Sequence, residues 1–180
     1  MAIGTAHRFS SSEFDRLVAS GALADLRVEL IEGVLVDVSP QGERHARMIQ
    51  RLTALLASRA GTLRVQLPLA VEDGSRPEPD LAVVDPEDGD EEHPPVTARL
   101  VIEVAQTSHE LDRAKAALYA RARVEVYWLV DAPAAEIVEH RQPTADGYLN
   151  VRTLTGQDRL DAGLPGVEGM TVASLFTPRR

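Results

Sequence analysis

The segment LVIEVAQTSHELDRAKAALYARARVEVYWLV, residues 100–130, carries the clearest fold signal in the chain. It opens with the apolar run Leu100–Ala105, broken by one carboxylate, and closes with the apolar run Val124–Val130. Residues 107–110, Thr-Ser-His-Glu, fit a capping box. The helix that this box opens has an apolar stripe at Leu111, Ala114, Leu118 and Ala122. Two apolar strands joined by one helix favour a parallel crossover connection.

Near the start of the chain the pattern predicts a β-hairpin. Residues 28–31 and 34–38 are rich in Val, Leu and Ile, and the pair Glu32-Gly33 between them is typical of a tight turn. Hairpin strands pair antiparallel, whereas the crossover pairs its strands in parallel. We therefore expect an α/β (α+β) fold with a mixed central β-sheet and flanking helices.

The other regular elements follow from the periodicity of the apolar residues. The pattern predicts two further helices, over residues 10–21 and 43–60. It predicts shorter strands over residues 63–71 and 81–84, around Ile137 and over 149–153, with a closing segment over 170–176. Asp80 would then stand where the strand 81–84 begins.

Length and composition predict one folded domain spanning residues 1–180, with 44% hydrophobic and 26% charged residues. We expect residues 1–8 to be flexible and residues 86–95 to form an acidic surface loop. No apolar run approaches the ~18 residues of a membrane span, and the first residues lack the features of a signal peptide. The prediction is a cytoplasmic protein without membrane contact.

The ionisable residues narrow the chemistry. The chain has no cysteine, which excludes disulfides, thiolate metal sites and cysteine nucleophiles, so any metal would have oxygen or histidine ligands. The formal net charge of −9 argues against affinity based on broad phosphate neutralisation, but it leaves nucleic acid open as a substrate. Lys115 is the only lysine among 19 basic residues. An ammonium can shift its pKa and make a compact contact, unlike a guanidinium, so Lys115 is a candidate functional residue.

Two carboxylates occupy places where an isolated charge would be unfavourable. Glu103 lies within an apolar strand and Asp80 at the head of another, and a lone buried charge costs several kcal/mol unless it is paired or metal-bound. The helix after Glu103 places Asp112, Lys115 and Tyr119 on a stripe beside its apolar one. Lys115 can therefore point back to Glu103. The same spacing fits a purely structural ion pair of Lys115 with Glu103 or Asp112.

Further short fragments occur in a particular order between Phe9 and Phe176. They are Glu29-Leu30-Ile31-Glu32-Gly33, Ser39-Pro40, His45, Pro79-Asp80-Leu81, Val101-Ile102-Glu103-Val104, Asp112 with Lys115 and Tyr119, Tyr127-Trp128-Leu129-Val130-Asp131 and Leu164-Pro165-Gly166. In this order they resemble the Uma-type restriction endonucleases, small bacterial members of the PD-(D/E)XK nuclease superfamily. Nearly the whole chain takes part in the resemblance.

The resemblance implies a restriction-endonuclease-like fold and a metal-dependent site. In that site Asp80 and Glu103 are metal ligands, Glu29 is a further acidic member and Lys115 is the catalytic lysine. The standard motif has its lysine next but one after the second acid, where this chain has Ala105. The family places it on the following helix instead, as Lys115 does. Carboxylates suit Mg²⁺, and Mn²⁺ would fit the same oxygen site.

Three other residues are candidates for contacts with these acids and the lysine. His45 matches a histidine of the family, although a histidine buried for packing would fit its place equally. Asp112 and Tyr119 share the helix of Lys115. The chain departs from the family pattern at Val34, where many relatives have an acid, and at residues 106–109, which replace a Ser-Pro-Ser-Thr-like stretch.

Three functions fit these observations. The first is a Mg²⁺-dependent endonuclease that hydrolyses DNA phosphodiester bonds. A homodimer would suit this function, because both strands must be cut. The second is a non-catalytic interaction protein in which the polar cluster is structural. The third is a hydrolase of small phosphodiesters, which an acidic surface would repel less than a long duplex.

Overall fold

The computed structural model describes residues 5–38, 42–57, 62–89, 93–105, 109–161, 163, 167 and 169–177, with residues 109–113 described by their backbone alone. The helices are α1 (Ser11–Ala19), α2 (Glu43–Leu56), α3 (His109–Arg121) and α4 (Val172–Phe176). The strands are β1 (Val28–Ile31), β2 (Val34–Asp37), β3 (Thr62–Val65), β4 (Leu81–Val84), β5 (Leu100–Val104), β6 (Val126–Asp131), β7 (Glu136–Thr144) and β8 (Gly147–Thr155).

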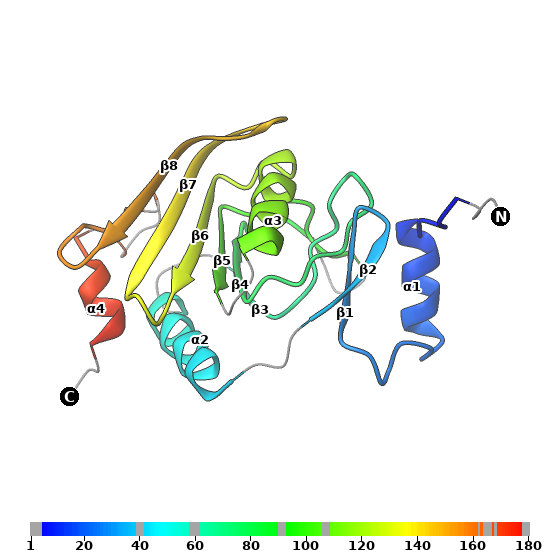
Figure 1. The fold of residues 1–180 in the computed structure, drawn as a ribbon, viewed down its shortest axis with the longest axis horizontal. Coiled ribbons are helices and arrows are strands. Elements are labelled where there is room, and N and C mark those ends of the chain that lie inside the picture. The colour runs from blue at the N-terminus through cyan, green and yellow to red at the C-terminus, as the bar shows by residue number, and fades with distance from the viewer. Residues whose placement is uncertain are drawn as a thin grey trace.

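The centre of the structure is a six-stranded sheet with the strand order β3-β4-β5-β6-β7-β8 (Figure 1). Strands β5 and β6 pair in parallel, with α3 as the crossover between them, and every other neighbouring pair is antiparallel. The mixed α/β sheet with flanking helices predicted from the sequence is confirmed.

The hairpin of β1 and β2 forms a separate two-stranded sheet. Its turn residues Glu32 and Gly33 have φ values of 49° and 79°. A Cβ at residue 33 would lie 2.9 Å from Arg8 Cβ and 3.2 Å from the Phe9 carbonyl oxygen. Glycine is therefore required there for space as well as for φ. The expected hairpin is present, but the antiparallel pairs that make the central sheet mixed come from the strands around β5 and β6.

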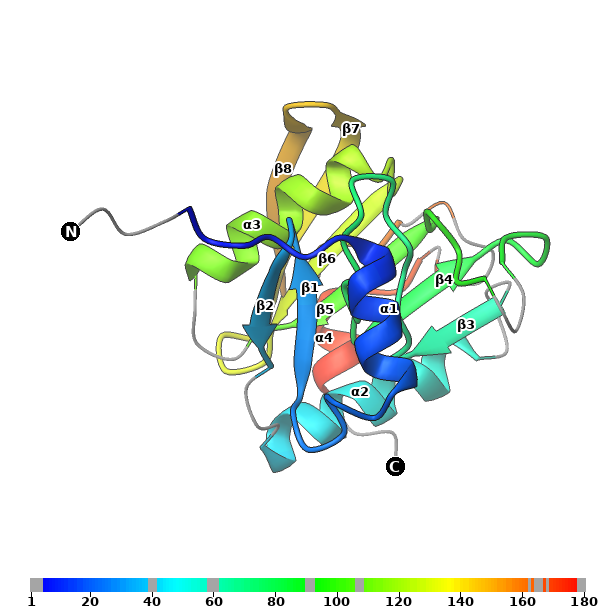
Figure 2. The same ribbon diagram turned by 90° about the vertical axis from the view of Figure 1, so that its right-hand side faces the viewer.

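Apolar side chains pack on both faces of the central sheet. One face is covered by α2 and α4, whose Leu52, Leu56 and Leu175 join inward residues such as Ile102 and Trp128. The other face is covered by α3 and the hairpin, which contribute Leu118, Tyr119 and Ile31. Figure 2 shows β1 and β2 lying between α1 and α3 on this second side. Strands β4 and β5 are thus buried on both faces, as the apolar run of β5 predicts, whereas β8 at the edge of the sheet is largely exposed.

Several elements differ from their predicted extents. The strand expected over 63–71 ends at Val65, because Gln66 takes a positive φ of 50° that breaks the extended backbone. The two short strands expected near Ile137 and 149–153 are nine residues each and form one long hairpin. The residues that would cap α3, Thr107 and Ser108, lie outside the described part. No helix in that part is long and apolar enough to cross a membrane.

Candidate active site

The pairing of β4 with β5 brings the two predicted acids together. These strands are antiparallel, with Leu81 opposite Ile102, and the same register continued by one residue sets Asp80 opposite Glu103. Along β5 the side chains alternate between the two faces, so Glu103 lies on the face that Val101 shares with α3. The start of β4 and the end of β5 therefore form one edge of the site.

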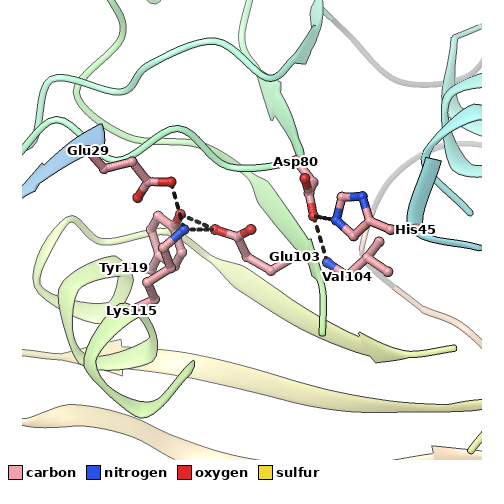
Figure 3. Close-up of polar contacts among 7 residues, drawn as sticks. All are labelled: Glu29, His45, Asp80, Glu103, Val104, Lys115 and Tyr119. Atoms are coloured by element: carbon pink, nitrogen blue, oxygen red, sulfur yellow. Dashed lines mark hydrogen bonds and ion pairs between the residues drawn. The ribbon is translucent and has the colours of Figure 1, made fainter. Parts of the chain in front are cut away.

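Asp80 is held by two donors (Figure 3). Its Oδ2 lies 2.9 Å from His45 Nε2 and accepts the Val104 backbone N–H at 2.9 Å. All three groups are buried, and His45 is only 7% exposed. His45 Nδ1 is buried and has no hydrogen-bond partner among the described residues. The predicted contact between His45 and an acid of the site is present, and it fixes the orientation of the Asp80 carboxylate.

Lys115 links the other two acids. Its Nζ lies 3.1 Å from Glu29 Oε1 and 2.9 Å from Glu103 Oε1, as Figure 3 shows. Glu29 comes from the hairpin, Glu103 from the central sheet and Lys115 from α3, so three separate parts of the fold meet at this ammonium. The sequence left Glu103 and Asp112 open as partners of Lys115. The structure shows the contact with Glu103 and adds Glu29, while the side chain of Asp112 is not described.

Tyr119 adds a second donor to Glu103. Its hydroxyl donates to Glu103 Oε1 at 2.7 Å, the same oxygen that Lys115 binds. Tyr119 follows Lys115 by one helical turn and is fully buried. The ring of Tyr119 therefore lies in the core beneath α3 while its hydroxyl reaches Glu103.

Burial dominates the electrostatics of the acids. It raises the pKa of Glu29 to about 7, with Lys115 opposing the rise and Glu103 adding to it. It also raises the pKa of Glu103, against the effects of Lys115 and Tyr119. Burial alone would lower the pKa of Lys115, but the carboxylates of Glu103 and Glu29 outweigh it and raise that pKa. Lys115 is therefore a permanent cation at neutral pH.

The site holds more negative than positive charge when its acids are ionised. The site has three carboxylates, Asp80, Glu29 and Glu103, and one ammonium. Each carboxylate has one oxygen, Oδ1 or Oε2, that accepts no hydrogen bond from the described residues. An excess of two negative charges and three free carboxylate oxygens fits a hard divalent cation in donor type and charge. Within the described part of the chain, however, no three acidic or histidine side chains converge as a metal site.

Other residues of the resemblance fall outside the described structure. The side chains of Asp112 and His109 are not described, so the predicted contact of Asp112 stays a prediction. The same holds for the fragments Ser39-Pro40 and Leu164-Pro165-Gly166.

One acid near the site, Glu78, is not among the residues that the sequence indicated. Burial raises the pKa of Glu78, while the cations of Arg27 and Lys115 lower it, and Glu78 in turn raises the pKa of Glu29. Glu78 is thus close enough to Lys115 and Glu29 to interact with them electrostatically. It lies next but one before Asp80, and the flanking Pro77 and Pro79 favour an extended backbone in which both side chains leave on one side. That spacing was the available signal.

Comparisons with known proteins agree with this architecture. A mixed sheet with flanking helices is the fold of the crystal structure described as "a putative nuclease belonging to DUF820 from Anabaena variabilis ATCC 29413". The match has a TM-score of 0.70 at 17% identity and covers 93% of this chain and 97% of that chain, which establishes the fold. The Uma2 family, described as "Putative restriction endonuclease", matches residues 11–173, and the chain belongs to it. A search of curated proteins finds no match.

Proposed function

We propose that this protein is a divalent-metal-dependent endonuclease that hydrolyses phosphodiester bonds in DNA. The observation that carries the proposal is the position of Lys115, whose ammonium joins Glu29 to Glu103 beside the oriented carboxylate of Asp80. Membership of the Uma2 family supports a nuclease reaction. Phosphodiester hydrolysis needs positive charge near a developing anion, and this site gathers carboxylates for a metal around a fixed cation.

Asp80 and Glu103 would hold the metal, with Glu29 as a third acid. Mg²⁺ is the cation that this donor set suits best, and Mn²⁺ would fit the same oxygens. Bound there, the metal would polarise the scissile phosphate and lower the pKa of a coordinated water. The excess negative charge of the cluster supports this assignment.

Lys115 would stabilise charge on the phosphate. The carboxylates of Glu103 and Glu29 raise its pKa and keep the ammonium protonated, so that it can donate hydrogen bonds to a phosphate oxygen. Its two carboxylate partners hold it in place before substrate binds. An ammonium has three donors, and Glu29 and Glu103 take two of them among the described residues, so a further donor would be available to the phosphate.

His45 and Tyr119 would position the acids. His45 Nε2 and the Val104 N–H orient Asp80, and the Tyr119 hydroxyl orients Glu103. Groups that orient metal ligands influence metal affinity without contacting the metal. We assign both residues to this role.

The net charge of −9 favours a second candidate, hydrolysis of small phosphodiesters, because like-charge repulsion slows the encounter with a long duplex. The homodimer and the cytoplasmic location stay predictions.

A nicking assay tests the proposal. Supercoiled plasmid and a dinucleotide are incubated with the wild type, Asp80→Ala and Lys115→Ala, with Mg²⁺ or with EDTA. The proposal expects Mg²⁺-dependent nicking by the wild type that both variants lose. Nicking that survives in both variants would refute it, and turnover of the dinucleotide without plasmid nicking would favour the second candidate.

A further inference from the structure

Three arginines of α2 line one depression on the protein surface. Arg44, Arg47 and Arg51 surround a cavity of about 290 Å³ whose other walls include Met48 and Phe176. Their spacing along the helix places them on one side of it. Arg44 and Arg47 are exposed, and Arg51 is half-buried. The helix has three arginines and one glutamate, a local excess of positive charge in a chain of net charge −9.

The depression lies at the same edge of the sheet as the candidate active site. Strands β5 and β6 are parallel, with Glu103 opposite Leu129, so their carboxyl ends meet at one edge. Ala132 and Ala135, in the turn after β6, line the depression. Figure 1 shows α2 beside the carboxyl end of β6. His45, which is the residue after Arg44, reaches Asp80 from the same helix.

The arginines are available to an anion. Arg44 has no hydrogen bond or ion pair with any residue that the structure describes. Arg47 pairs with Glu43 at 2.8 Å, but these side chains are 73% and 75% exposed. Exposed pairs of this kind are weak and easily exchanged. Arg51 donates one bond to the Leu175 carbonyl at 3.1 Å, which holds the side chain in place and leaves the other guanidinium donors without a partner among the described residues.

We infer that Arg44 and Arg47, supported by Arg51, bind backbone phosphates of the nucleic acid on one side of the scissile bond. The inference rests on the proposed function and extends it to substrate binding. A guanidinium fork matches phosphate oxygens in geometry and charge. His45 of α2 reaches Asp80, and Arg44, Arg47 and Arg51 of the same helix line the depression, so a polyanionic strand that extends from Asp80 along α2 would contact these arginines. This local basic surface would attract phosphates although the net charge of the chain is −9.

The test measures the salt dependence of binding, because each phosphate contact contributes about 0.9 to the slope of log affinity against log salt. Wild type and Arg44→Gln/Arg47→Gln bind a fluorescent duplex in EDTA, where metal-dependent cleavage is prevented. The control, Arg16→Gln/Arg123→Gln, removes the same charge from two exposed arginines on α1 and after α3. Circular dichroism and thermal melting confirm that each variant is folded.

We expect the α2 variant to reduce the slope by about two and to weaken binding uniformly across sequences, while the control keeps a slope close to that of the wild type. An unchanged slope in the α2 variant, or an equal loss in the control, would overturn the inference. The plasmid-nicking assay is independent of this result. Binding that depends on the arginines without any nicking would support the phosphate-binding surface and refute the proposed reaction. Nicking with an unchanged slope would support the proposed reaction and refute the phosphate-binding surface.

Discussion

Lys115 and Glu103 form an ion pair of 2.9 Å between α3 and β5, with both side chains almost fully buried. The pair connects the helix of the crossover to the strand that precedes it, and Glu29 draws the hairpin into the same contact. Buried ion pairs contribute little net stability compared with apolar packing, yet removing one partner is strongly unfavourable. This asymmetry makes the pair testable by mutation.

Lys115→Met is expected to lower the free energy of unfolding by about 3–5 kcal/mol at pH 8, because it leaves two buried carboxylates without their cation. The loss should be smaller at pH 5, where Glu29 and Glu103 can be protonated. Urea denaturation at the two pH values measures both effects.

Arg121→Met is a matched control on the same helix. Arg121 pairs with Glu32 and Asp73 at the surface. Its removal should therefore cost no more than about 1 kcal/mol. Equal losses in both variants would contradict the account.

Glu29 should make the wild type less stable as pH rises from about 4.5 towards its folded pKa of about 7. Burial raises this pKa, so the folded state binds a proton that the unfolded state has released, and the free energy of unfolding falls with pH in that window. Glu29→Gln should flatten the profile. Glu13→Gln provides a control of opposite sign, because the hydrogen bond from the Ser10 backbone lowers the pKa of Glu13 and its contribution is lost as pH falls. A Glu29→Gln profile that parallels the wild type would refute the assignment.

His45→Ala should weaken Mn²⁺ binding by about 10- to 100-fold, the range found when a group that orients a metal ligand is removed. Isothermal titration calorimetry at pH 7.5 measures the affinity. His7→Ala removes an exposed histidine of the amino-terminal segment and should leave the affinity unchanged. If both variants bind Mn²⁺ like the wild type, His45 does not act through Asp80.

Tyr119→Phe removes a hydrogen bond to a carboxylate, whereas Tyr148→Phe removes one to the Val124 carbonyl. Bonds to charged groups contribute about 1.5–3 kcal/mol and neutral ones about 0.5–1.5 kcal/mol, so the first variant should lose more stability at pH 8. The difference should narrow at pH 5, because burial raises the pKa of Glu103 and a lower pH favours its protonated form. Denaturation of both variants at both pH values decides the matter, and equal losses at pH 8 would show that Tyr119 contributes packing alone.

The central part of the fold could be predicted because local patterns and topology agree there. The apolar runs of β5 and β6 with the helix between them define the parallel pair, and the Glu32-Gly33 turn defines the hairpin. The extent of β3 could not be predicted from alternation alone, because Gln66 adopts a positive φ within an alternating run. The separation of the hairpin from the main sheet could not be predicted either, because tertiary packing determines it.

The acids of the site were predictable as residue types but not as contacts. Glu103 and Lys115 stood out because a carboxylate interrupts an apolar strand and a single lysine occurs in the chain. Their pairing with Glu29 depends on where the hairpin packs, which no spacing in the sequence encodes. Glu78 was missed because an acid in a proline-flanked segment resembles an ordinary surface residue.

The most direct test of the account is calorimetric titration of Mg²⁺ and Mn²⁺ into the wild type and Asp80→Ala, with plasmid nicking measured on the same samples. We expect the wild type to bind metal and nick the plasmid, and Asp80→Ala to lose both. If the wild type binds no metal, and Asp80→Ala is merely less stable, then the cluster of Asp80, Glu103, Glu29 and Lys115 is a structural network and the proposed reaction is wrong.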